Sequence, residues 1–277
     1  MINIVCEYFF TFIIYSVAGW IMETLLFLIR DKKVVKRGFL FGPVCPIYGC
    51  GAVICTAVLY GKVNNIFLLF IYGLLLCGTL EYITHFVMEK MFHAMWWDYS
   101  SRRFNINGRV YLNGLLIFGA GAVLIVKVLQ PLVFRLIGVI PQSVLYWICF
   151  IAYSILLVDF AGTISDLKGV FASVKHLQNT VITGTQKGVD LTREQVAELN
   201  NRIKENEFVS NSINAIKNES KIVDRMRNVF PNLTLKKYKY IWDIIMDKPQ
   251  EENARKDIKL YGTAETIPDG EHDTDGL

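Results

Sequence analysis

The sequence predicts an all-α protein: a polytopic membrane bundle of about five transmembrane helices followed by a cytoplasmic helical segment. Two observations carry this prediction. Of the 277 residues, 53% are hydrophobic and only 19% are charged, and the apolar stretches lie almost entirely before Phe160. The sequence after Asp166 has instead the charge-rich composition of a water-soluble segment. We therefore expect the two parts of the chain to be surrounded by different solvents.

Five apolar stretches have lengths close to that needed to cross a bilayer. A hydrocarbon core about 30 Å thick requires roughly 20 helical residues. The predicted spans are Val5–Ile29, Val44–Tyr60, Ile66–Val87, Val110–Val128 and Val144–Phe160, of which the second and the fifth are short. Glycines in the first four spans indicate closely packed helices, because a residue without a side chain lets two backbones approach.

Basic residues are concentrated in two of the loops between these spans. The first loop contains Arg30, Lys32, Lys33, Lys36 and Arg37, and the third contains Lys90, Arg102, Arg103 and Arg109. Loops rich in Lys and Arg tend to stay in the cytoplasm. We therefore expect the N-terminus to be outside and the C-terminus to be cytoplasmic.

The segment from Pro131 to Ile140 bears on the number of spans. We expect it to lie on the outer surface as an amphipathic segment, because Arg135 and a length of about ten residues argue against insertion. If it entered the bilayer fully, there would be six spans and the C-terminus would be outside.

Two acidic residues lie within predicted spans. Glu23 shares a helical face with Ser16 and Gly19 and should contact protein, and Glu81 lies deep in the third span. A carboxylate in hydrocarbon is costly unless it is paired or hydrated, so both are candidate functional residues. Arg37 and Arg109 are the nearest cations, and such pairs could also simply brace the bundle.

Two segments interrupt regular helix near the membrane. Arg37–Pro43 (RGFLFGP) and the following Pro46–Gly49 are rich in Gly and Pro, and irregular backbone at membrane depth is tolerated only where protein or an aqueous cavity surrounds it. In the third loop, Trp96–Ser100 and Phe104–Arg109 combine aromatic and hydrogen-bonding residues. These two stretches of the third loop could also be an aromatic belt with turn residues.

Five charged residues fall near the cytoplasmic half of the bundle on this topology: Glu23, Arg37, Glu81, Asp98 and Arg109. We hypothesise that they form one polar site beneath the loop from Arg37 to Pro43. Secondary candidates for the same site are Trp20, Tyr48, His85, Trp97, Asn105 and Asn107.

Glu81, His85, Glu89 and His93 recur at every fourth position, a spacing that metal sites use. The row spans about 18 Å along a helix, so all four residues cannot bind one ion. We expect a polar row that faces the bundle and no metal site. The six cysteines show no CxxC pairing, and we expect no cofactor.

Three parts are expected: a transmembrane bundle (1–163), a cytoplasmic helical segment (164–247) and a disordered tail (248–277). The run Ile164–Leu177 should extend the fifth helix, and Thr192 with Gln195 resembles a capping box. The basic, aromatic stretch Leu235–Trp242 either rests on an anionic leaflet or packs onto the cytoplasmic helices.

Several motifs occur in a recognisable order: Gly19-Trp20 with Glu23, RGFLFGPVCPIYG from Arg37, Leu80-Glu81-Tyr82, WWDYS from Trp96 and FNINGR from Phe104. They resemble a bacterial family of ABC-transporter permeases labelled type IV, and the resemblance covers about residues 8–165. It implies a multi-pass protein of the bacterial cell membrane. It also implies that the ATPase is a separate chain, since ITGTQKGV from Ile182 does not match a phosphate-binding loop.

Three functions follow as hypotheses. The first is a permease component that moves a small polar or amphiphilic substrate with a separate ATPase subunit or another membrane protein. The second is a non-catalytic scaffold or sensor that binds a soluble partner through its C-terminal helices. The third, a lipid-modifying enzyme, is disfavoured because no catalytic constellation is evident, and we expect no enzyme. The net charge of +4 is too small for a nucleic-acid partner, so membrane lipid is the expected surrounding.

Overall fold

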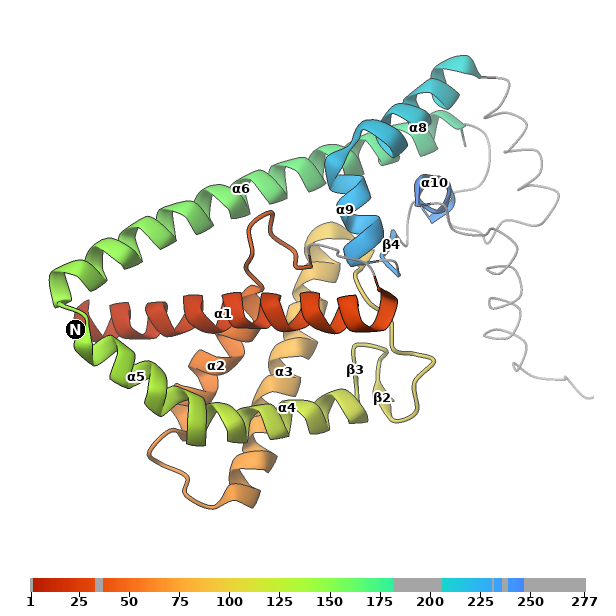
Figure 1. Cartoon of the computed structure of the whole chain (residues 1–277). Helices are drawn as coiled ribbons and strands as arrows, with labels where there is room; N and C mark the ends of the chain where they lie inside the picture. Colours follow the sequence, from red (N-terminus) through yellow and green to blue (C-terminus); the bar gives the residue numbers. More distant parts are fainter. Residues whose placement is uncertain (1, 33–36, 182–205, 231, 236–238, 247–277) are drawn as a thin grey trace, which may run out of the picture.

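The computed structural model describes residues 2–32, 37–181, 206–230, 232–235 and 239–246 (Figure 1). Helices dominate these residues, and the strands among them are two residues long. This confirms the predicted all-α helical bundle.

The membrane part consists of α1 (Ile2–Asp31), α2 (Pro46–Leu59), α3 (Ile66–Phe92), α4 (Leu112–Leu124), α5 (Gln130–Val139) and α6 (Gln142–Val181). Within the described residues, four helical stretches are long and apolar enough to cross a membrane. They are Asn3–Arg30, Ile66–Phe92, Leu112–Val139 and Gln142–Leu177. The remaining expected span, Val44–Tyr60, corresponds to α2, which has only 14 residues.

The fourth span differs from the prediction. A π-helical turn, η1 (Ile125–Leu129), joins α4 directly to α5, so the segment from Pro131 to Ile140 continues a span instead of lying separately on the surface. Proline lacks an N–H group and its ring crowds the preceding turn of a helix. The π turn before Pro131 changes the hydrogen-bond register there, which lets the helix run on. One long helix therefore replaces a span and a surface segment, and the number of crossings does not rise.

Helix α2 begins near the middle of α1, not at its end. The N–H of Cys45, the residue before α2, donates to the carbonyl oxygen of Ser16 at 3.0 Å. A Cβ atom built on Gly49 would lie 2.5 Å from the Phe12 carbonyl oxygen, and one on Gly19 would lie 2.6 Å from Tyr48 Cβ. The chain after α1 therefore returns to the middle of that helix before α2 starts, and both glycines are needed for the close approach.

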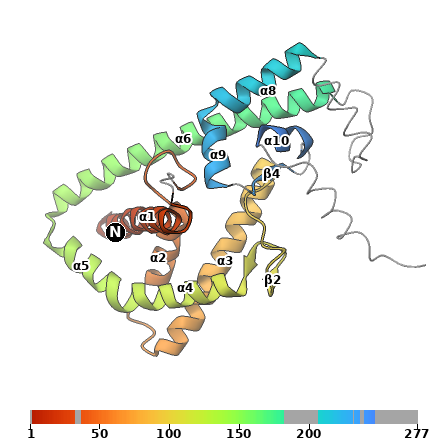
Figure 2. The same cartoon turned by 45° about the vertical axis from the view of Figure 1, so that its right-hand side comes forward.

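Helix α6 is continuous over 40 residues, which confirms the expected extension of the fifth span beyond Phe160. Its first turns contact α1, where Tyr146 donates to Asn3 and Cys149 Sγ donates to the Cys6 carbonyl oxygen. Further along, α6 diverges from α1, and the segment between α1 and α2 occupies the space between them (Figures 1 and 2).

The C-terminal helices α8 (Glu207–Glu219), α9 (Lys221–Val229) and α10 (Lys239–Ile245) surround a second core at the far end of α6. Strand β4 (Thr234–Leu235) pairs antiparallel with β1 (Ala94–Met95), which directly follows α3. Trp96 and Trp242 are both fully buried in this core. The C-terminal segment therefore packs around residues that belong to the third loop.

Some expectations fall outside the described residues: the capping box at Thr192 and Gln195, the tail from 248 and part of the basic stretch. Of that stretch, Leu235 lies in β4 and Trp242 is buried in α10, where its indole N–H donates to the Leu233 carbonyl oxygen. These two residues thus pack on the C-terminal helices, as one of the two alternatives expected.

A hairpin of β2 (Asn105–Ile106) and β3 (Val110–Tyr111) completes the third loop.

Candidate functional site

Glu23 of α1 and Arg37 of the following loop form an ion pair. Arg37 Nε lies 3.4 Å from Glu23 Oε2, and both side chains are largely shielded from solvent. Tyr48, in the first turn of α2, donates from its hydroxyl to Glu23 Oε1 at 2.8 Å. One carboxylate thus holds together α1, the segment after it and the start of α2. This arrangement meets the requirement that an acid within a span must have a partner.

Arg37 also reaches the C-terminal helices. Its Nη1 donates to the carbonyl oxygens of Val229 at 2.8 Å and Asn228 at 3.3 Å, at the end of α9. From the same helix, Arg225 donates to the Gly38 carbonyl oxygen at 3.1 Å, and its guanidinium lies 4.5 Å from the centre of the Phe41 ring. Two arginines therefore join the loop after α1 to α9. Burial lowers the pKa of the Arg225 guanidinium, and the negative charge of the nearby Asp159 carboxylate partly offsets this decrease.

Asp159 of α6 holds the other side of this loop. Its two carboxylate oxygens accept the N–H groups of Phe41 and Gly42, each at 2.8 Å. A Cβ atom on Gly42 would lie 2.9 Å from Asp159 Oδ2, so the approach depends on glycine. The irregular backbone thus finds its hydrogen-bond partners in protein, as non-helical backbone near hydrocarbon requires.

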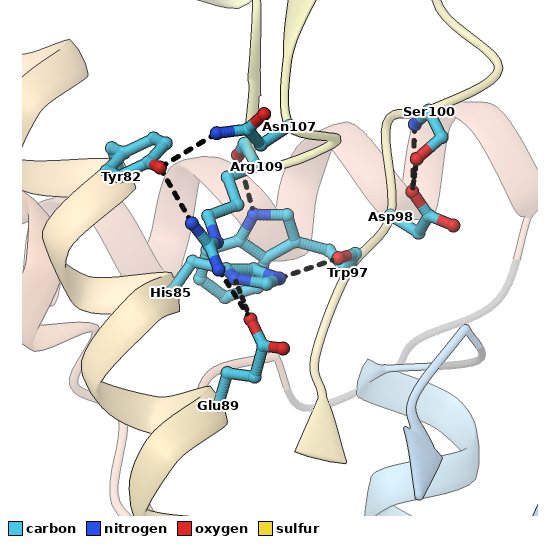
Figure 3. A network of polar contacts seen from close by, with 8 residues as sticks. All are labelled: Tyr82, His85, Glu89, Trp97, Asp98, Ser100, Asn107 and Arg109. Carbon is cyan, nitrogen blue, oxygen red and sulfur yellow. Dashed lines mark hydrogen bonds and ion pairs between the residues drawn. The ribbon is translucent and has the colours of Figure 1, made fainter. Parts of the chain in front are cut away.

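A second polar group lies where α3 meets the third loop (Figure 3). Arg109 Nη2 donates to Glu89 Oε2 at 2.9 Å, and Nη1 donates to the Tyr82 hydroxyl at 2.7 Å. Asn107 donates to the same hydroxyl at 3.0 Å. The hydrogen bond with Glu89 is the main reason why the pKa of Arg109 lies above its usual value. These contacts attach the loop to the side of α3.

His85 and Trp97 lie beneath Arg109 in the same group (Figure 3). His85 Nε2 donates to the Trp97 carbonyl oxygen at 2.9 Å, and its Nδ1 lies 3.8 Å from Glu89 Oε2. The Trp97 indole N–H donates to the Arg109 carbonyl oxygen at 3.1 Å. His85 is almost completely buried, so its hydrogen bond to Trp97 and the nearby Glu89 carboxylate take the place of water around the ring.

Asp98 and Asn105 have a different role, because both bind the backbone of their own loop. Asp98 accepts hydrogen bonds from the N–H and the hydroxyl of Ser100. The Asn105 side chain donates to the carbonyl oxygens of Ser100 and Arg102 and accepts the N–H of Gly108. These side chains fix the shape of the loop.

Glu81 of α3 belongs to neither polar group. It is 9% exposed, and among the described residues no hydrogen bond or ion pair involves its carboxylate. The pKa of Tyr99 is raised mainly by burial, next by the Glu81 carboxylate, and then by Tyr111 and the Glu23 carboxylate. Tyr99 therefore lies within electrostatic reach of both acids.

The five hypothesised site residues therefore do not form one site: Glu23 and Arg37 form one group, Arg109 belongs to another, Asp98 binds its own loop, and Glu81 stands apart. Glu23 pairs with Arg37, Arg109 pairs with Glu89 instead of Glu81, and Asp98 binds within its loop. Of the secondary candidates, Tyr48, His85, Trp97 and Asn107 belong to these groups, Asn105 shapes the third loop, and Trp20 lies beside Gly38.

Sequence reasoning missed three contributors: Asp159, Arg225 and Tyr82. Asp159 had a signal, because it is an acid at the end of an otherwise apolar run. Arg225 had none, since it lies among many other charged residues. Among the described residues, no group of three or more His, Cys, Asp or Glu side chains could hold a metal ion.

The long apolar helices and the paired charges between them define a helical membrane protein. A family model described as "Putative ABC-transporter type IV" matches residues 10–164, and the chain belongs to this family. The matched region includes Glu23, Arg37, Arg109 and Asp159 and ends before the C-terminal helices. No curated protein and no solved structure matches the chain.

Proposed function

We propose that the chain is the transmembrane permease component of an ABC-type transporter of the bacterial cell membrane, with its ATPase on a separate chain. It has no enzymatic activity of its own in this proposal. The observation that carries the proposal is the interrupted segment at Glu23. There, non-helical backbone reaches the middle of α1, and a short helix starts beside a carboxylate–guanidinium pair. Transporters build midplane substrate sites from interrupted helices of this kind.

The orientation belongs to the same proposal, with the N-terminus outside and the C-terminus in the cytoplasm. Both basic loops contact the C-terminal segment, the first through Arg37 with Val229 of α9 and the third through the pairing of β1 with β4. The two loops and these helices are therefore on one side of the bundle, and the excess of Lys and Arg favours the cytoplasm for that side.

The experiment is purification of the tagged full-length protein from native membranes in a mild detergent. We expect an ATPase subunit to co-purify and its ATP hydrolysis to fall in the Glu23→Gln variant, with Arg135→Gln as the matched control at an exposed site. If the monodisperse protein is recovered repeatedly without an ATPase, the permease proposal is wrong.

The contact between α9 and the loop also favours a second function, that of a sensor or scaffold. In that case the recovered partner would be a soluble protein without ATPase activity. Its binding should be lost in Phe208→Ala, which removes an exposed aromatic side chain of α8 and leaves the membrane part unchanged.

A further inference from the structure

An exposed basic and aromatic turn lies at the membrane end of the third loop. Arg102 and Arg103 are exposed, Phe104 is 73% exposed and Ile106 is 54% exposed. In the described part of the chain, neither arginine forms an ion pair with an acidic side chain. The turn therefore offers two exposed guanidinium groups that pair with no acid in the described residues, and two exposed apolar side chains.

This turn is adjacent to a membrane-spanning helix. The Phe104 carbonyl oxygen accepts the N–H of Leu112, the first residue of α4, at 3.1 Å. The spans that flank the third loop also have exposed apolar side chains: Ile117 of α4 is 67% exposed and Met91, near the end of α3, is 60% exposed. Phe104 therefore lies beside the first turn of α4, at one end of that span.

The turn is also held in shape. Asp98 fixes Ser100, and Asn105 binds the carbonyl oxygens of Ser100 and Arg102. Phe104 has a φ angle of +53°. Residues other than glycine rarely adopt this left-handed backbone conformation, and it costs about 1 kcal/mol or more. The Phe104 ring is 5.9 Å from the Arg103 guanidinium. Two side chains, Asp98 and Asn105, therefore fix the shape of the turn, and it includes a strained residue.

We propose that the turn formed by Arg102, Arg103 and Phe104 binds the anionic phospholipid headgroups of the leaflet in which α3 ends and α4 begins. Guanidinium groups form paired hydrogen bonds with phosphate oxygens, and aromatic rings favour the level of the headgroups. Anionic leaflets attract basic side chains that lie at their surface. This inference is independent of whether the chain transports anything.

The test uses the full-length protein with Phe104→Trp, reconstituted in vesicles, with the wild-type fluorescence subtracted. Lipids brominated in the upper part of their acyl chains quench an indole that contacts them. We expect brominated phosphatidylglycerol to quench the introduced indole about twofold more than brominated phosphatidylcholine, because the arginines enrich the anionic lipid. Adding Arg102→Gln and Arg103→Gln should remove the difference.

Phe67→Trp is the matched control, because Phe67 is 69% exposed at the other end of α3. Its introduced indole should be quenched equally by both lipids. Quenching of the Phe104→Trp variant by aqueous iodide and by neither lipid would overturn the proposal, since the turn would then lie in water. Equal quenching by both lipids, unchanged by the arginine substitutions, would also overturn it, because the turn would then be an aromatic anchor without headgroup recognition. As a second measurement, native mass spectrometry should find less retained anionic lipid in Arg103→Gln than in Arg135→Gln.

Discussion

Arg37 has contacts in two different environments. Its guanidinium group pairs with Glu23 within the bundle and donates to carbonyl oxygens at the end of α9. A partly buried charge is stable only when its partners remain, because the cost of leaving one unpaired exceeds the gain from the pair itself. Arg37 therefore makes the geometry at Glu23 depend on the position of α9.

Glu23→Gln and Arg37→Gln should be non-additive in stability. Each single substitution removes the charged partner of the other group, so we expect each to lower the free energy of unfolding by about 2 kcal/mol, with a coupling of about 1 kcal/mol. Thermal unfolding in detergent measures both values. Glu23→Gln combined with Arg109→Gln should be additive, because Arg109 pairs with Glu89. Additivity in the first pair would show that Glu23 and Arg37 do not share a site.

Asp159→Ala should release the loop between α1 and α2. It removes both acceptors of the Phe41 and Gly42 N–H groups, and we expect a loss of about 3 kcal/mol. Hydrogen exchange of the peptide that contains these residues should become faster. Asp166→Ala is the control, since Asp166 is exposed on the same helix. Equal exchange in the two variants would mean that Asp159 does not hold the loop.

At the scale of elements, the sequence predicts where the long helices are and not how they pair. The hydropathy of a stretch indicates that hydrocarbon surrounds it, but not which helices it packs against. This is why α1, α3 and α6 were predictable as spans. The continuous span from Leu112 to Val139 was missed because Pro131 and Arg135 are read as breaks, while a π turn has no sequence signature.

The candidate site shows the same limit. Glu23 and Arg37 could be proposed as partners because an acid within a span requires a cation. That Arg109 pairs with Glu89 and not with Glu81 depends on how the third loop folds back along α3, and spacing alone does not encode this. Arg225 belongs to a separate element, so only the tertiary structure brings it to Gly38.

Gly49→Ala should separate α2 from α1. The added methyl group would lie 2.5 Å from a main-chain oxygen of α1, which cannot move aside without shifting the helix. We expect a loss of stability of about 2 kcal/mol or more, and a weaker contact between Tyr48 and Glu23. Gly121→Ala provides the control, because a Cβ atom there has nothing within 4 Å. Similar unfolding temperatures for the two variants would contradict the close packing of α1 and α2.

At the scale of the whole molecule, residues of the membrane bundle and residues of the C-terminal helices pack together in the second core. Trp96, from the loop after α3, packs against Phe230 with ring centres 5.1 Å apart, and Phe171 of α6 packs against Trp242 at 5.6 Å. The second core is thus built from segments that are far apart in the sequence. Because α9 also binds the loop beside Glu23, unfolding of this core should disturb that loop.

Trp242→Ala should loosen this second core. The side chain is fully buried, and its removal should cost about 3–5 kcal/mol. Limited proteolysis should then cleave α8 to α10 rapidly while the spans remain protected in detergent. Trp147→Ala, at a 67% exposed position of α6, should not change the cleavage rate. Resistance equal to the wild type in Trp242→Ala would show that the second core does not depend on this residue.

The uninterrupted length of α6 has a mechanical consequence. A rod of 40 residues is about 60 Å long, and its side-chain bonds to α1 are at the end that carries Tyr146 and Cys149. With that end as a pivot, a tilt of about 5° would displace the opposite tip by about 5 Å. Such a rotation of α6 would move the C-terminal helices the most. It would move Asp159, which lies near the midpoint of the helix and binds the loop, about half as far.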